Sequence, residues 1–347
     1  MSLLRQLRPD RFTLALLATV VLASLLPCRG DAALWLDRLT DAAIALLFFL
    51  HGAKLSRSAI VQGATHWRLH LAILASTFVL FPLLGLMLKP LGHALLTPQL
   101  TLGLLFVCTL PSTVQSSIAF TSIAGGNVPA AVVSASLSSL LGIALTPLLV
   151  ELLLATHGGG GAGWQGVRDI VLQLLLPFVL GHLARPWIGG FVDRHRPLLG
   201  ITDRGTILLV VYAAFGEAVV EGLWRTTPPL ALMLTLALDG VLLALALCMT
   251  GWMARRLGFA RADRIAMVFC GSKKSLASGI PMARVLFAGQ AGGLGALLLP
   301  LMIFHQLQLM ACAVLARRYA AQAAAPESPA QDVLEPTERQ ADYSQRP

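Results

Sequence analysis

Charged residues are scarce in this 347-residue chain, where aspartate, glutamate, lysine and arginine together make up only 12%. A soluble domain carries about 25%. Hydrophobic residues make up 56% of the sequence, and the mean hydropathy is +0.75. This composition excludes an ordinary soluble domain and predicts an all-α protein that crosses the lipid bilayer many times. The net charge of +9 is typical of basic cytoplasmic loops, so we expect no nucleic-acid partner.

Cysteine is also sparse, and its pattern excludes a disulfide framework. There are five cysteines, widely spaced and without a Cys-x-x-Cys pair. Most lie in apolar runs, where a free cysteine behaves as a small hydrophobic residue. The glycine run 158–161 lacks the Gly-Lys-Ser/Thr ending of a phosphate loop. We therefore predict no metal site, no cofactor and no enzymatic activity.

Long apolar segments dominate what the sequence does contain. A membrane span needs about 20 mostly apolar residues. Residues 1–27 resemble a signal peptide but lack a small-x-small cleavage site, so we interpret them as a retained first span. The polar, proline-rich residues 319–347 are expected to form a disordered cytoplasmic tail. The predicted spans are 12–27, 34–52, 68–89, 100–124, 128–155, 166–185, 202–222, 229–254, 263–287 and 294–316.

The distribution of lysine and arginine predicts how the spans are oriented. With the N-terminus inside, sixteen of these residues fall on the inner side and six on the outer side. Cytoplasmic loops are enriched in positive charge. We therefore expect a multi-pass protein of a bacterial inner (plasma) membrane, with both termini in the cytoplasm.

Ten spans divide into two sets of five, about residues 10–155 and 164–318, which together form one transporter domain over 1–318. Because five is odd, the second set would insert upside down, as an inverted repeat. The fourth span of each set contains a helix-breaking residue, Pro111 or Gly271, followed by a polar cluster. Paired interruptions of this kind point to the binding site of a transporter.

The first interruption carries five short polar side chains directly after the proline. Proline removes a backbone donor and disturbs the preceding turn, and the freed carbonyls need a partner or a water-filled cavity. A kink satisfied by neighbouring hydroxyls is the alternative interpretation. We favour an unwound segment that lines a substrate or ion cavity, formed by Pro111, Ser112, Thr113, Gln115, Ser116 and Ser117.

The second interruption reads Gly271-Ser272-Lys273-Lys274-Ser275, near the middle of the ninth span. One charge at the bilayer centre costs roughly 2.5–3.5 kcal/mol on the insertion scale. The lysines lie too deep for easy snorkelling, which favours a functional role. Anions that could compensate them are Asp41, Glu217, Glu221 and Asp239, of which Asp239 has the most apolar surroundings.

Two histidines lie within or at the end of spans. His51 ends the second span, and His305 lies in the last one. A single histidine per span is more often an interhelical hydrogen-bonding group than a metal ligand. We treat both as possible polar partners of the site.

Four stretches together resemble the bile acid:sodium symporter superfamily, in the divergent branch that groups bacterial proteins with the seventh vertebrate solute carrier of that family. They are Phe-Phe-Leu-His-Gly-Ala-Lys-Leu-Ser (48–56), Pro-Ser-Thr-Val-Gln-Ser-Ser-Ile-Ala-Phe (111–120), Phe-Cys-Gly-Ser-Lys-Lys-Ser-Leu (269–276) and His-Gln-Leu-Gln-Leu (305–309). The resemblance covers about residues 10–320. It implies ten spans, a panel domain and a core domain, and a site where broken helices 4 and 9 cross.

The resemblance also exposes departures at the positions of the sodium ligands. Asn127 fits the Gly-Asn of the family before the fifth span. Phe269 stands where sodium-coupled members carry a glutamate, Lys273 where they carry a glutamine, and Thr77 where the third span has a glutamine. We therefore hypothesise that Lys273, together with Lys274, takes the electrostatic place of the sodium ions.

These observations predict a secondary active transporter of a small organic anion that works by alternating access. We expect coupling to protons or no coupling, because Phe269 and Lys273 place sodium, the other candidate ion, in doubt. A membrane sensor or regulator that keeps the fold without transporting is the alternative. The substrate identity and the oligomeric state are left open.

Overall fold

The computed structural model describes residues 11–54, 66–154, 171–287 and 294–324, and these residues form helices and short connections without a strand. The helices, in chain order, are α2 (Arg11–Leu25), α3 (Asp31–Lys54), α5 (Trp67–Ala75), the π turn η1 (Ser76–Leu80), α6 (Phe81–Leu95), α7 (Pro98–Thr109), α8 (Gln115–Ile123), α9 (Val128–Leu154), the π turn η2 (Val171–Leu175), α11 (Leu176–Arg194), α12 (Arg196–Val220), α13 (Leu223–Thr226), α14 (Pro229–Arg256), α15 (Arg261–Gly271), α16 (Leu276–Leu286) and α17 (Leu294–Ala324).

The described part of each predicted apolar segment overlaps one or more of these helices. Within the described ranges, six continuous helical stretches are long and apolar enough to cross a membrane, one of which, Trp67–Leu95, joins α5, η1 and α6. Leu14–Leu25 and Pro98–Thr109 form shorter apolar helices. Large apolar side chains such as Leu152, Trp187 and Met233 are more than 60% exposed on the outer faces of the bundle. A polytopic membrane protein places such side chains against lipid, so the predicted class is confirmed.

Two of the predicted segments are broken, as the sequence indicates. The helix α7 ends at Thr109, and the chain runs without regular structure until α8 begins at Gln115. The helix α15 ends at Gly271, and α16 begins at Leu276 after a four-residue break. The proline and the glycine therefore stop these helices inside an apolar run, and each break exposes one helix end on either side.

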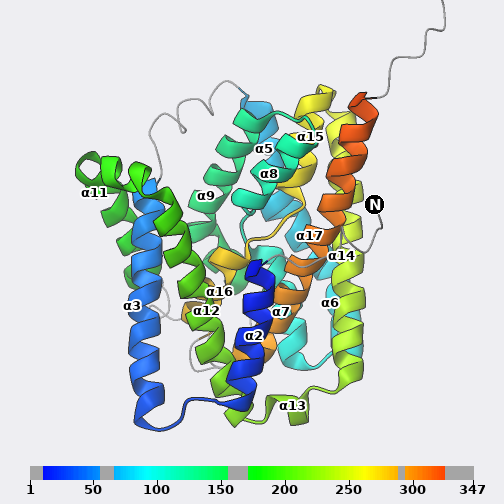
Figure 1. The fold of residues 1–347 in the computed structure, drawn as a ribbon. Coiled ribbons are helices and arrows are strands. Elements are labelled where there is room, and N and C mark those ends of the chain that lie inside the picture. Colours follow the sequence, from blue (N-terminus) through cyan, green and yellow to red (C-terminus); the bar gives the residue numbers. More distant parts are fainter. Residues whose placement is uncertain (1–10, 55–65, 155–170, 288–293, 325–347) are drawn as a thin grey trace, which may run out of the picture.

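The helices pack as two groups, which we name the panel group (α2, α3, α11 and α12) and the core group (α5–α9 and α14–α17). In Figure 1 the panel helices α3, α11 and α12 stand on the left, while α5, α6, α14, α15 and α17 lie to the right. The helix α12 contacts both α16 and α17 of the core group. The two groups therefore share one interface, which runs beside the broken helices.

The panel group depends on the close approach of α3 and α11. A Cβ atom added to Gly52 would collide with the backbone of Phe178, and one added to Gly181 would collide with the backbone of Phe49. Two glycines facing opposite backbones let the helices touch at this point, as small residues do in membrane helix pairs.

The core group is filled by aromatic rings around the broken helices. Phe81 of α6 and Phe304 of α17 lie edge to face at 6.1 Å, and Phe106 and Phe287 do so at 5.2 Å. Phe81, Phe106 and Phe304 are fully buried. Such aromatic pairs prefer this geometry and fix the helices around them.

The C-terminal boundary needs a correction. The helix α17 continues to Ala324, so residues 319–324 are helical and not part of a disordered tail. The alanine-rich sequence Tyr-Ala-Ala-Gln-Ala-Ala has a high helix propensity and extends the span beyond its apolar part. The rest of the predicted tail, 325–347, lies outside the described residues.

We expect Gly181→Ala to lower the thermal midpoint of the purified protein by several degrees, because overpacking a helix contact costs about 1–3 kcal/mol. Gly190→Ala, on the same helix, is the matched control, since a Cβ atom there meets nothing within 4 Å. Scanning fluorimetry in detergent measures both. Equal midpoints for the two variants would show that the α3–α11 approach is not tight.

Candidate functional site

The two breaks cross and bind one another through backbone and hydroxyl groups. The Ser275 N–H donates to the Pro111 carbonyl at 2.9 Å, and the Ser112 hydroxyl donates to the Cys270 carbonyl at 2.6 Å. The Ser117 hydroxyl donates to the Phe269 carbonyl at 3.0 Å. The polar residues after Pro111 thus satisfy the free carbonyl end of α15, which has no partners within its own helix.

The helix α9 supports the first break from its other side. Its Ser138 hydroxyl accepts from the Ser112 N–H at 3.0 Å, and its Thr146 hydroxyl donates to the Thr109 carbonyl at 2.9 Å. Both hydroxyls are buried. The unwound backbone is therefore held in place by hydroxyl groups, as non-helical chain at membrane depth requires.

Lys274 lies at the centre of the crossing with its ammonium fully buried. Its Nζ donates to the carbonyls of Thr77 at 2.8 Å, Cys108 at 3.1 Å and Leu110 at 2.7 Å. The Phe81 ring centroid lies 4.1 Å from the same atom. The ammonium therefore sits in a cage of three carbonyls and one aromatic face, at the negative end of the α7 dipole.

Lys273 is buried as deeply but has different surroundings. Its Nζ lies 4.0 Å from the Phe120 ring centroid and 5.7 Å from that of Phe269. No hydrogen-bond partner for this atom is found among the described residues. Both lysines lie in the non-helical break between α15 and α16, where the backbone directs one side chain to carbonyls and the other to aromatic faces.

Gln308 of α17 clamps the backbone of Lys274. Its Oε1 accepts from the Lys274 N–H at 2.9 Å, and its Nε2 donates to the Lys274 carbonyl at 2.8 Å. These two bonds assign the oxygen and the nitrogen of the Gln308 side-chain amide. The Nδ1 of His305, 2.9 Å from the same Nε2, must then accept, so the ring carries its proton on Nε2.

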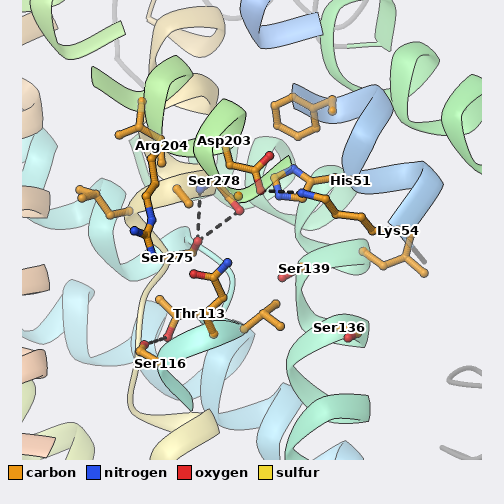
Figure 2. A pocket seen from close by; sticks show the side chains of 18 of the residues that line it. His51, Lys54, Thr113, Ser116, Ser136, Ser139, Asp203, Arg204, Ser275 and Ser278 are labelled. Carbon is orange, nitrogen blue, oxygen red and sulfur yellow. Dashed lines mark hydrogen bonds and ion pairs between the residues drawn. The ribbon is translucent and has the colours of Figure 1, made fainter. Parts of the chain in front are cut away.

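A cavity of about 620 Å³ lies between the panel and core groups, beside the crossing. Figure 2 shows Thr113, Ser116, Ser275 and Ser278 on the core side and His51, Lys54 and Asp203 on the panel side. Its apolar lining includes Phe12, Phe48, Leu140, Ile143, Phe178 and Met282. This size and this mixture of apolar walls and a few polar groups are typical of small-molecule sites.

Charge in the cavity comes from the panel group. Lys54 Nζ is paired with Asp203 Oδ2 at 2.6 Å, and Asp193 is paired with Arg185 at 3.3 Å. Arg204 also lines the cavity, and none of the ion pairs between described residues includes it. In Figure 2 its side chain extends from α12 toward the break that holds Ser275.

The predicted site residues divide into three sets. Some line the cavity: His51, Thr113, Gln115, Ser116, Ser275 and His305. Others form the buried crossing behind it: Thr77, Pro111, Ser112, Ser117, Gly271, Ser272, Lys273 and Lys274. The remaining three, Asn127, Glu217 and Asp239, lie elsewhere and are described next.

Asn127 caps α9, because its Oδ1 accepts from the Ala130 N–H at 3.0 Å and its Nδ2 donates to Asp263 at 2.7 Å. Glu217 lies 3.6 Å from Arg284 at the opposite end of α12 from the cavity. Asp239 is fully buried, and neither of its carboxyl oxygens has a hydrogen-bond partner among the described residues. The anticipated Lys–Asp pair is therefore not formed by the described part of the chain.

Sequence reasoning missed several residues of the site. Lys54 and Arg204 count only among the inner-side basic residues and Asp203 carries no sequence signal, although all three line the cavity. Gln308 belongs to the stretch 305–309 that resembles the family, but no sequence signal indicates its bonds to the Lys274 backbone. The i, i+4 pair His66 and His70 was also overlooked; His70 is bonded to Ser134 at 2.6 Å, and no group of three metal-ligating residues occurs in the described ranges.

Comparison with known proteins places the chain among transporters. The model of the SBF-like CPA transporter family matches residues 10–321. An uncharacterised protein of Pseudomonas aeruginosa is 61% identical over 90% of this chain and 93% of its own length. The candidate symporter YfeH of Escherichia coli K12 is 58% identical over 89% and 92%. Sodium/bile acid cotransporter 7-B of Xenopus laevis is 28% identical over 91% and 93%.

We expect Lys274→Met to destabilise the protein far more than Lys273→Met. Removing the Lys274 ammonium strands buried carbonyls, each costing roughly 1–3 kcal/mol, whereas Lys273 leaves no hydrogen-bond acceptor behind. Both changes keep the side-chain volume similar, so each is the control of the other. Thermal melts at neutral pH measure the difference, and equal losses would contradict the carbonyl cage.

Proposed function

This chain belongs to the SBF-like CPA transporter family, and we propose that it is a secondary transporter of a small organic anion working by alternating access. The observation that carries this proposal is the cavity between two helix groups, directly beside two crossing broken helices. A site of this kind can be exposed to either side when one helix group moves against the other. The family itself consists of symporter-like transporters rather than enzymes.

The net charge of the cavity supports an anionic substrate. Lys54 and Asp203 neutralise one another, and Arg185 neutralises Asp193, so the guanidinium of Arg204 supplies the remaining charge. A guanidinium binds carboxylate, sulfonate or phosphate groups through paired hydrogen bonds. Ser275 and Ser278 would add hydroxyl donors from the opposite wall, while the apolar lining would hold the organic part.

Coupling to sodium is disfavoured by the buried Lys274. A metal cation seeks hard oxygen ligands, and the three carbonyl oxygens here are already bound to an ammonium. A second positive charge next to it would be repelled strongly in a medium of low polarity. We propose that Lys274, more than Lys273, is a tethered cation that makes sodium unnecessary, and that transport is coupled to protons or is uncoupled.

The topology that completes this proposal is ten spans in two inverted repeats, with the Lys54 end of α3 facing the cytoplasm of a bacterial inner membrane. The excess of basic residues at this end of the helices supports that orientation. The same orientation places the cavity near the cytoplasmic side, since its panel residues come from the Lys54 end of α3 and from the first half of α12.

The binding test is a thermal-shift screen with organic carboxylates, sulfonates and phosphates. We expect a stabilising anion to lose affinity by roughly 10- to 100-fold in Arg204→Gln, because a hydrogen bond to a charged group contributes about 1.5–3 kcal/mol. Arg225→Gln removes the same charge outside the cavity and should change nothing. Equal loss in both variants would mean that anions bind nonspecifically.

The transport test uses proteoliposomes and an anion found in that screen. We expect uptake to be the same in sodium and potassium buffers and to be saturable. Uptake that sodium stimulates in wild type and in Lys274→Met alike would contradict the tethered-cation model. Binding without any flux, under sodium or pH gradients, would instead favour a membrane sensor that uses the same fold.

A further inference from the structure

Arg284 joins three carboxylates at the far end of the interface between the two helix groups. Its Nη2 lies 2.6 Å from Asp37 Oδ1, its Nη1 lies 3.6 Å from Glu217 Oε2, and its Nε lies 4.0 Å from Asp41 Oδ1. We name these four residues the Arg284 cluster. None of them lines the cavity.

The Arg284 cluster connects the panel group to the core group. Arg284 lies near the end of α16, in the core group, whereas Asp37 and Asp41 lie early in α3 and Glu217 lies late in α12. The pair Lys54–Asp203 stays within the panel group, and Arg185–Asp193 stays within α11. Among the ion pairs of the described residues, only those of Arg284 cross between the groups.

The cavity lies toward the opposite end of the same helices. On α3 the cluster occupies positions 37 and 41, while the cavity is lined by Phe48, His51 and Lys54. On α12 Glu217 lies near the last turn, while Asp203 and Arg204 lie near the start. Each residue of a helix advances it by about 1.5 Å, so Asp37 and Lys54 are separated by roughly 25 Å.

Close packing seals the interface on the side of the cluster. Gly295 of α17 lies against α12: an added Cβ atom would come within 2.8 Å of the Ala218 side chain and 3.2 Å of the Ala214 carbonyl. Ala214 and Ala218 are almost completely buried. The two groups thus touch through small residues and ion pairs at one end and enclose a cavity toward the other.

The four side chains of the cluster differ in solvent exposure. The Arg284 side chain is 16% exposed, whereas Asp37, Asp41 and Glu217 are 47%, 55% and 55% exposed. If the helix groups separate, water can solvate the half-exposed carboxylates. Arg284, which is mostly buried, would lose all three of its ion-pair partners. Ion pairs that involve such half-exposed carboxylates each contribute little to stability, so the contact can break when the groups separate.

We propose that the Arg284 cluster is a releasable gate, which keeps this end of the protein closed while the cavity is accessible from the other end. The proposal rests on the alternating-access function proposed above. To expose the cavity to the opposite side of the membrane, α16 must move away from α3 and α12, and the ion pairs of Arg284 must break first. Removing the arginine should therefore favour the conformation that is open at this end.

The test measures distances between spin labels on full-length protein in lipid nanodiscs, with no substrate required. Labels at Leu34 of α3 and Leu230 of α14 report on the cluster end, since both side chains are more than 60% exposed. The exposed Cys248 and partly buried Cys28 are changed to serine, and the three buried cysteines are kept. The variants are Arg284→Gln, the same-end control Arg225→Gln, and the charge swap Asp37→Arg with Arg284→Asp.

We expect a longer distance to appear in Arg284→Gln, with the open population raised roughly tenfold. Arg225→Gln should resemble wild type, and the charge swap should return most of the population to the short distance. An unchanged distance in Arg284→Gln would overturn the proposal. Broadening together with a lower melting temperature, and no recovery in the charge swap, would also overturn it, because Arg284 would then be only a structural contact.

The outcome separates this proposal from the proposed function. A gate that opens in Arg284→Gln, in a protein that binds anions but never transports them, would uphold the gate and reject the transporter. Transport of an anion by a protein in which no variant changes the label distance would uphold the transporter and reject the gate.

Discussion

The bond network of the Lys274 ammonium holds the centre of this structure together. It joins the carbonyls of Thr77, Cys108 and Leu110, which belong to the π turn η1 and to the end of α7. The clamp of Gln308 on the Lys274 backbone adds α17. Four chain segments thus meet at one residue. A buried ammonium is costly in lipid unless it is fully hydrogen-bonded, so the position of the broken helices depends on this cage.

The two breaks solve the same problem in different ways. Each leaves a helix end whose carbonyls have no partner within the helix. At the end of α7 the lysine supplies the donors, whereas at the end of α15 the hydroxyls of Ser112 and Ser117 do so. The cavity begins directly beyond, at Thr113 and Ser275. The crossing therefore forms the floor of the cavity, whereas the contacts between the helix groups at Arg284 and Gly295 lie away from it.

Much of this architecture could be predicted, because a membrane span must be apolar along its own length and is therefore visible in the local composition. Apolar runs of span length predict the helices. Pro111 and Gly271 predict the breaks, because proline and glycine act on the backbone of their own segment. The same local signals fail where residues far apart in sequence combine. The sequence does not show that Asn127 caps α9, and it indicates Arg204 only as one of the inner-side charges, although Arg204 lines the cavity. Hydropathy does not predict the helix end at Ala324, because the sequence becomes less apolar after residue 318 while its helix propensity stays high through the alanines of 319–324.

The sequence alone determined the class of the protein, the location of its breaks and the presence of two positive charges where membrane proteins rarely keep them. These follow from composition and from residues that act within one turn of themselves. Only the tertiary structure decided that Lys274 is bound by carbonyls while Lys273 faces aromatic rings, that Asp239 pairs with neither, and that Arg284 bridges the helix groups. The partners in these contacts are up to 247 residues apart, and such pairings depend on how whole helices pack, which no local pattern encodes.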